Sequence, residues 1–404
     1  MPAVQRLLSN TAAACFLLAF LAGCATQSFV NPEVDSASFL ARRITQTDGP
    51  VTVTVAVPDA AETQSLFGLP LYEQNVQPVW LKIENQGTGP VRLAIWSIDP
   101  DYFSPLEVAW MNRGGYNKDG KAAMEQWFHE NGISRRVGPG KARSGFVFTN
   151  LKPGTKGFNV DVFSSDAAFS FTFFVPLPGF TPDYMQVDVQ DLYADSEMTN
   201  LSSVDDIRQA VRSLPSYTTD SSSSKQGGPF NVVLVGTGMA VRRAMLRAGW
   251  LETEAGSTET STAHRQHYRG RPADGIYHKA RADGSERREL RLWLTPMTAG
   301  DDNLWVGQVA GDLSDTTKDL TDYLLDPDID NTRGYLFQNF WYSQSLTQVA
   351  FAKGAEATTA DNQHESFSGA SYFTDGMRAV LWISEDPVGL DDAILLPWEI
   401  PVRE

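Results

Sequence analysis

Hydrophobic and polar residues alternate through much of the first half of the chain. Residues 51–57 alternate valine with threonine and alanine, and this period of two predicts a half-buried strand. Similar short apolar runs predict strands at residues 79–83, 91–98, 145–148, 158–162 and 169–175. The turn-rich segment 85–90 predicts that the strands on either side of it pair as a hairpin. Several short strands with regular turns predict an antiparallel β-sandwich over residues 50–180, roughly immunoglobulin-like.

Two features interrupt this strand pattern. Met124, Trp127 and Phe128 have helical spacing, and Gly132 follows as a stop signal. The apolar segment 67–71 reads Phe-Gly-Leu-Pro-Leu. Two interpretations of that loop stay open, because such a segment is either buried or in contact with lipid.

The periodicity changes after residue 180. Residues 181–230 are predicted to be a linker with one helix, in which Ser203 precedes apolar residues at helical spacing. From residue 231 onward, buried-strand runs alternate with helical patterns. Strands are expected at 231–235, 289–294, 304–309, 348–351 and 378–383, and helices before Gly249 and at 331–342. This alternation predicts a mixed α/β domain over residues 231–404, so the chain as a whole is α+β with two domains.

The N-terminus carries the clearest processing signal. Arg6 precedes a short apolar stretch at about residues 11–21, and residues 21–24 read Leu-Ala-Gly-Cys. The stretch is shorter than the roughly 20 residues that span a bilayer. The pattern predicts a bacterial lipoprotein signal over residues 1–23, with Cys24 acylated, for example by palmitate, as the first mature residue.

An acylated Cys24 would place the mature chain in the cell envelope. Two or more acyl chains attach a protein stably to a membrane, and the polar segment 24–49 is expected to be a tether. The mature protein is therefore predicted to face the periplasm, with the membrane and an envelope protein as partners. Ala25 follows the cysteine where an aspartate would favour the inner membrane, so the outer membrane is favoured.

Charge and cysteine content exclude several classes of function. The net charge of −16 argues against nucleic-acid binding, which requires a basic face, and against electrostatic adhesion to anionic lipids. Cys15 lies in the predicted signal. The mature chain then has no intrachain disulfide, no cysteine-ligated metal and no cysteine nucleophile.

A glycine-rich turn and an acidic run are the candidate binding motifs. Gly236-Thr237-Gly238 is expected between a strand and a helix, where backbone N–H groups can meet a phosphate. The dinucleotide fingerprint needs a third glycine where this chain has Val241. The motif therefore favours a tight turn, and neither a nucleotide nor another cofactor is predicted.

The acidic run places Asp326, Asp328 and Asp330 at alternate positions, and two interpretations stay open. The three carboxylates could hold a metal such as Ca²⁺, although the EF-hand pattern is not met. Alternatively, Asp330 caps a helix that starts at Asn331, with the other two carboxylates in the favourable field of its N-terminus. Arg333 is expected to pair with one of them. The chain lacks the Gly-x-Ser-x-Gly and His-Glu-x-x-His motifs, so no catalytic residue is assigned.

Four motifs in the second half resemble one known family. They are NVVLVGTGMAVRRAMLRAGW, RRELRLW, WVGQVAGD and DPDIDNTRGYL. In this order they resemble the LssY C-terminal domain family over about residues 203–383. The resemblance implies an envelope context but no catalytic residues. It also implies histidines near the second and fourth motifs, where this chain has Glu289 and Leu324-Leu325. The first half, with QPVWLKIEN and DPDYFSPLEV, resembles the β-domain that often precedes this module in lipoproteins.

Two functions are consistent with these observations. The favoured one is a lipid-anchored envelope protein that acts as a non-catalytic binding or scaffolding module. The alternative is a metal-assisted hydrolase of an envelope lipid or phosphoester, in which Asp326, Asp328 and Asp330 hold the metal.

Overall fold

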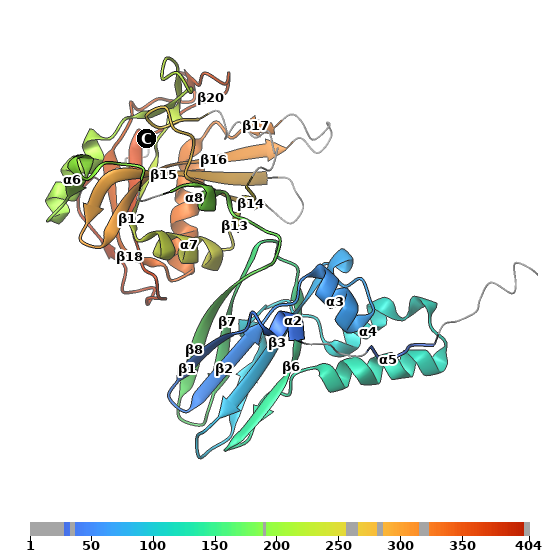
Figure 1. The fold of residues 1–404 in the computed structure, drawn as a ribbon. Helices are drawn as coiled ribbons and strands as arrows, with labels where there is room; N and C mark the ends of the chain where they lie inside the picture. Colours follow the sequence, from blue (N-terminus) through green and yellow to red (C-terminus); the bar gives the residue numbers. More distant parts are fainter. Residues whose placement is uncertain are drawn as a thin grey trace, which may run out of the picture. The chain divides into compact units, whose positions relative to one another are not determined.

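The computed structural model describes residues 28–32, 37–188, 191–255, 266–280, 286–314 and 323–399, with the backbone alone for 37, 312–314 and 323–325. Strands hold 40% of the residues and helices 25%, in several largely antiparallel sheets, which confirms the α+β class. The chain divides into two compact units (Figure 1). Unit 1 comprises residues 1–152 and 158–177, and unit 2 comprises residues 153–157 and 178–404.

Unit 1 is built from two four-stranded sheets that share one core. The first sheet has the order β1 (Ile44–Asp48), β2 (Val51–Ala56), β3 (Val76–Asn85), β6 (Lys141–Asn150). The second has the order β5 (Arg136–Val137), β4 (Val91–Ala94), β7 (Thr155–Phe163), β8 (Ala168–Pro176). Alternate residues of both sheets, such as Val53, Leu81, Val160 and Phe173, are buried in the same cluster. The period of two in the sequence therefore corresponds to burial between two facing sheets.

Two expectations for unit 1 are wrong. Strand β4 does not pair with β3, because after β3 the chain crosses to the second sheet, where β4 pairs with β5 and β7. The Asn85 side chain holds this crossing by donating to the carbonyls of Gly89 (2.8 Å) and Val137 (3.2 Å). The tether expected over residues 24–49 is also too long. Strand β1 pairs with β2 along its whole length, and Phe39 in the short helix α2 (Ala37–Leu40) is buried.

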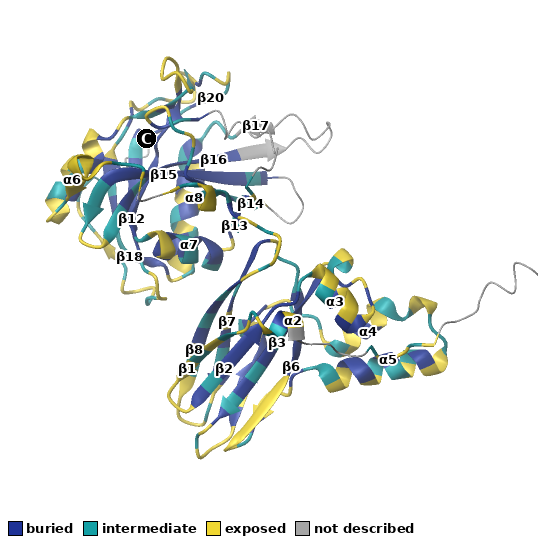
Figure 2. Cartoon of the chain, in the orientation of Figure 1, coloured by how far each residue is buried: buried dark blue, intermediate teal, exposed yellow. Residues whose placement is uncertain are grey.

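Three helices pack on the outer face of the first sheet of unit 1 (Figures 1 and 2). They are α3 (Ala60–Phe67), α4 (Pro105–Asn112) and α5 (Lys118–Asn131). Helix α5 ends at Gly132 as predicted. The large apolar side chains of segment 67–71 are buried in the core beneath these helices, because Phe67, Leu69 and Leu71 are at most 5% exposed. The interpretation of this loop as a lipid contact is therefore wrong.

Unit 2 is organised around one ten-stranded mixed sheet. Its order is β13 (Leu251–Glu252), β14 (Gly275–Ala280), β15 (Glu286–Ala299), β16 (Asp302–Ser314), β12 (Val232–Gly236), β21 (Met377–Ile383), β18 (Leu346–Lys353), β22 (Ile394–Leu395). Strand β17 (Tyr323–Leu325) pairs with β16, and β9 (Thr199–Asn200) pairs with β15. Two hairpins, β10 (Tyr217–Thr219) with β11 (Gln226–Pro229) and β19 (His364–Glu365) with β20 (Ser371–Tyr372), complete the described strands of unit 2.

Helices cover both faces of this sheet. Helices α7 (Gly238–Arg247) and α8 (Ile329–Tyr342) contribute to one core cluster, and α6 (Val204–Ser213) contributes to the other. Neighbouring residues of β12 divide between them, Leu234 facing α7 and Val233 facing α6. The helix predicted within residues 181–230 is α6, with Ser203 as its N-cap. The segment is not a linker, however, because Val211 of α6 is fully buried in unit 2. Among the described residues, no helix has the length and apolar content needed to cross a membrane.

Candidate functional site

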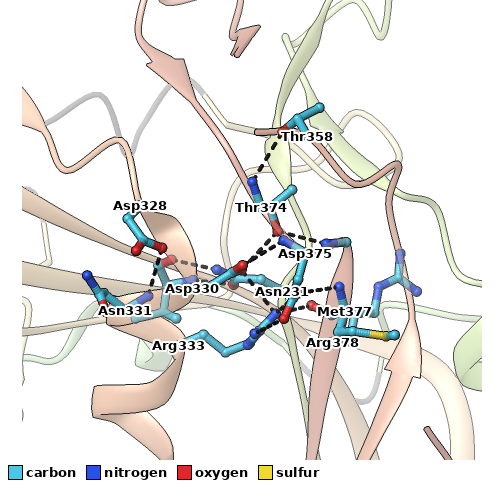
Figure 3. Close-up of polar contacts among 12 residues, drawn as sticks. Asn231, Asp328, Asp330, Asn331, Arg333, Thr358, Thr374, Asp375, Met377 and Arg378 are labelled. Carbon is cyan, nitrogen blue, oxygen red and sulfur yellow. Dashed lines mark hydrogen bonds and ion pairs between the residues drawn. The ribbon is translucent and has the colours of Figure 1, made fainter. Parts of the chain in front are cut away.

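The acidic run singled out in the sequence lies at the start of α8 (Figure 3). The N-cap of α8 is Asp328, whose carboxylate accepts the Asn331 N–H at 3.3 Å. Asp326 in turn accepts the Asp328 N–H at 3.0 Å. The prediction that Asp330 caps this helix is wrong. Ile329 is 3% exposed, and its burial as the first helical residue starts the helix two residues earlier than expected.

Asp330 points instead toward the loop that precedes β21, where it joins a charged network (Figure 3). The Arg333 guanidinium donates to both carboxylate oxygens of Asp375, at 2.8 and 2.7 Å, and lies 3.1 Å from Asp330. It also donates to the Met377 carbonyl at 2.6 Å. The predicted pairing of Arg333 with one of the acidic residues is therefore confirmed. Asp330, Arg333, Thr374 and Asp375 are called the α8 network below.

The rest of the α8 network fixes the loop before β21. Asp330 accepts the Thr374 hydroxyl at 2.9 Å and the Asp375 N–H at 2.6 Å. Burial raises the pKa of Asp330, and the neighbouring Arg333 opposes that rise. Gly376 follows with φ of +77°, and a Cβ there would lie 2.6 Å from the Ala355 carbonyl oxygen. These contacts tie α8 to the first residues of β21, which is a structural role.

The three predicted carboxylates do not share a ligand position. Asp326 serves a backbone N–H, Asp328 caps the helix, and Asp330 belongs to the α8 network. In the part of the chain that the structure describes, no group of three or more His, Cys, Asp or Glu side chains could hold a metal ion. The interpretation of this run as a metal site is therefore not supported by the geometry.

A second charged cluster, which sequence reasoning missed, surrounds Glu252. The Glu252 side chain is 1% exposed and lies 2.7 Å from Nε of Arg242 on α7. The Thr155 and Tyr184 hydroxyls also donate to it, at 2.8 and 3.0 Å. Next to it, burial raises the pKa of Asp183 to about 7. Thr155 is separated from Glu252 by 97 positions, so no local spacing in the sequence signals this cluster.

A third missed feature is Arg378, a fully buried arginine in β21. Its guanidinium donates to the carbonyls of Phe230 (2.9 Å), Val211 (2.7 Å) and Leu214 (3.3 Å), and also to that of Pro215. Burial lowers its pKa to about 10. Val211 lies near the end of α6 and Leu214 is its C-cap, and the Val211 carbonyl also accepts the Leu214 N–H at 3.4 Å. Arg378 therefore ties the end of α6 to β21.

The remaining motifs also have structural roles. Thr237 caps α7 by accepting the Ala240 N–H at 3.0 Å, which agrees with a tight turn at the glycine-rich motif. Glu289, which stands where the family resemblance implied a histidine, is buried and pairs with Arg291 at 2.8 Å. Arg291 also donates to Gln308 at 2.6 Å. Cys24 and the rest of the predicted signal lie outside the described residues.

Comparison with known families identifies the second half of the chain. Residues 211–377 match the family model described as LssY C-terminus. A comparison with curated proteins finds no match to this chain. The matched segment begins near the end of α6 and reaches β21. It includes the α8 network and the pair of Glu252 with Arg242, but not Thr155 or Tyr184. As its four motifs predicted, the chain carries a domain of the LssY C-terminus family.

Proposed function

We propose that this chain is a lipid-anchored protein of the cell envelope, attached through Cys24 and facing the periplasm, with the outer membrane favoured. In this proposal the immunoglobulin-like sandwich of unit 1 and the LssY C-terminal domain of unit 2 act together as a non-catalytic binding or scaffolding module. The lipoprotein pattern at residues 21–24 supports the anchor. Because one fold can serve many functions, the proposed function is argued from the charged and aromatic residues described below and not from the fold.

The main support for a non-catalytic role is that the buried charged side chains of unit 2 are engaged by other groups of the fold. The Arg333 guanidinium is 6% exposed and is engaged by two carboxylates and a backbone carbonyl. Arg378 is engaged by backbone carbonyls. Groups held in this way stabilise the fold and are not poised toward a substrate, whereas catalytic side chains need access to the reacting atoms.

Exposed aromatic residues on α8 support a binding role in unit 2. Trp341 and Tyr342 are 40% and 67% exposed, and Phe337, Trp341 and Tyr342 stack in sequence with ring centroids 5.6 and 6.4 Å apart. The Trp341 indole N–H donates to the Leu390 carbonyl at 2.8 Å, which holds the ring in place. Rigid exposed aromatic rings are typical of protein interfaces, so an envelope protein is the proposed partner.

The anchor is tested by metabolic labelling with an alkyne-bearing palmitate in cells that express the wild-type chain or Cys24→Ser. We expect label and membrane sedimentation for the wild type, and loss of label with Cys24→Ser. An unmodified Cys24 thiol, found by mass spectrometry in the wild-type protein, would contradict the anchor. Binding is then tested by photo-crosslinking from position 342 in intact cells, with position 204 on α6, which is 40% exposed, as the control.

A further inference from the structure

Helix α4 presents large apolar side chains to solvent. Leu106, Trp110 and Met111 are 50%, 51% and 44% exposed, whereas Val108 and Ala109 on the other side of the helix are fully buried. Large side chains exposed together on one element mark an interaction site more often than isolated ones do. Figure 2 shows this alternation of exposed and buried positions along α4 and α5.

The exposed tryptophan is held in a fixed orientation. Its indole N–H donates to Glu125 on α5 at 2.8 Å, and the Arg113 guanidinium lies 4.1 Å from the ring centroid. Beside it, a shallow open groove runs along the start of α5, lined by Tyr116, Asn117, Lys118, Lys121, Ala122 and Glu125. Leu106, Trp110 and Met111 together with Lys118 and Lys121 are called the α4–α5 surface below.

The N-terminal segment packs along α5. The Phe29 ring packs edge-on against Tyr116 and Trp127, with centroids 5.8 and 6.2 Å away. The Asn117 side chain, which lines the groove, donates to the Ser28 hydroxyl at 3.3 Å. Ser28 therefore lies beside the α4–α5 surface. Cys24 lies four positions before it, a separation that a fully extended chain spans in at most about 14 Å.

From this geometry we propose that the α4–α5 surface rests on the lipid bilayer that holds the anchor, an inference that depends on the proposed acylation of Cys24. A tether of four residues leaves the surface at a high effective concentration relative to the membrane, so that even a weak contact is populated. Trp110 and the neighbouring apolar side chains suit the interface between headgroups and acyl chains. Lys118 and Lys121 extend apolar stems there while their ammonium groups stay hydrated.

The contact is apolar rather than electrostatic. The net charge of −16 disfavours attraction to anionic lipids, and the lysines of this surface lie among acidic residues such as Asp119 and Glu125. Binding to an interface scales with buried apolar area when charge contributes little. The contact is therefore expected to form on vesicles of neutral phosphatidylcholine.

The experiment uses the full acylated chain, purified from membranes and reconstituted into phosphatidylcholine vesicles. Met111→Cys and, separately, Phe163→Cys are labelled with a nitroxide. Acylated Cys24 does not react, and Cys15 is absent after cleavage. Phe163 is the matched control, since it is 39% exposed and points outward from β7, on the sheet of unit 1 opposite the helices. We expect the label at 111 to become severalfold less accessible to a water-soluble nickel chelate on vesicles, with no change at 163.

The outcomes separate the two proposals. If the protein floats with the vesicles but both labels stay equally open to the nickel chelate, the anchor stands and the bilayer contact is overturned. If the chain carries no acyl group and does not float, the proposed anchor fails and this inference fails with it. Crosslinking from position 111 in cells to a protein, rather than to lipid, would also overturn the contact. Circular dichroism of each variant shows whether its fold is retained.

Discussion

The two units differ in what they bury. Among the described residues of unit 1, Asp99 is the only charged side chain that is almost fully buried, and it accepts hydrogen bonds from Asn150. The described part of unit 2 buries many more: Lys156, Glu252, Asp274, Glu286, Arg288, Glu289, Arg291, Arg333, Arg378. The stability of unit 1 therefore depends on apolar packing between its sheets, whereas that of unit 2 depends also on complete pairing of charges.

This difference is tested most strongly by removing one member of the α8 network. Arg333→Met leaves the partly buried carboxylates of Asp330 and Asp375 without their cation. We expect unit 2 to lose about 3–5 kcal/mol of its free energy of unfolding, the usual cost of breaking a buried ion pair. Hydrogen-exchange mass spectrometry on the full chain reports protection in each unit separately.

The control for this variant is Arg92→Met in unit 1, where Arg92 is an exposed residue of β4. It should change protection in either unit by less than about 0.5 kcal/mol. Equal protection of unit 2 in Arg333→Met and in the wild type would show that the buried charges contribute nothing to its stability.

The pH dependence of the two units should also differ. Burial raises the pKa of Asp183 in unit 2 from its ordinary 3.8 to about 7. Folding therefore favours the protonated form, and unit 2 should lose stability as the pH rises from about 4 to about 7. The loss is at most about 4 kcal/mol, since one pKa unit corresponds to about 1.4 kcal/mol. Unfolding by urea at a series of pH values measures this slope, and Asp183→Asn should flatten it.

In unit 1, the ion pair of Arg42 with Glu62 gives stability the opposite pH dependence. The Arg42 guanidinium donates to Glu62 and lowers the pKa of that carboxyl below 4.5. This pair stabilises unit 1 above the ordinary pKa of glutamate, and its contribution is lost as the pH falls through the lowered value. Between about pH 5 and pH 7 its contribution should therefore vary little. A parallel loss of stability in both units over that range would contradict the comparison.

A smaller effect is expected at the start of α8. Asp328→Ala removes the N-cap and should lower the free energy of unfolding of unit 2 by about 0.5–2 kcal/mol. Asp326→Ala, which keeps the cap and removes one hydrogen bond to a backbone N–H, is the matched variant and should cost less. Chemical denaturation of both proteins at neutral pH compares them. A larger loss in Asp326→Ala would indicate that the helix start is held in another way.

Local sequence patterns predicted the positions of strands and helices, but not which strands pair or which distant residues come into contact. Alternation in the sequence predicted β2, which is buried between two sheets, and a continuous apolar run predicted β12, whose residues are all buried. The prediction that β3 and β4 form a hairpin was wrong. The turn between them does not determine which strand β4 pairs with, because β4 crosses to the second sheet and pairs there with β5 and β7. Arg333 was predicted to pair with the acidic run three positions away, but its main partner, Asp375, lies 42 positions along the chain. Arg378 interrupts an apolar strand without any local signal of the carbonyls that surround it.

The smallest expected effect is that of calcium. If Asp326, Asp328 and Asp330 held Ca²⁺ in unit 2, a concentration 100 times the dissociation constant would stabilise that unit by about 2.7 kcal/mol. These carboxylates already serve separate donors within the fold, so we expect millimolar Ca²⁺ to leave the melting temperature of unit 2 unchanged. The Asp328→Ala protein is the control, because any calcium effect centred on this run must decrease in it. A rise in melting temperature in the wild type that disappears in Asp328→Ala would show that the carboxylates rearrange around a cation, and that unit 2 can exchange internal pairing for a ligand.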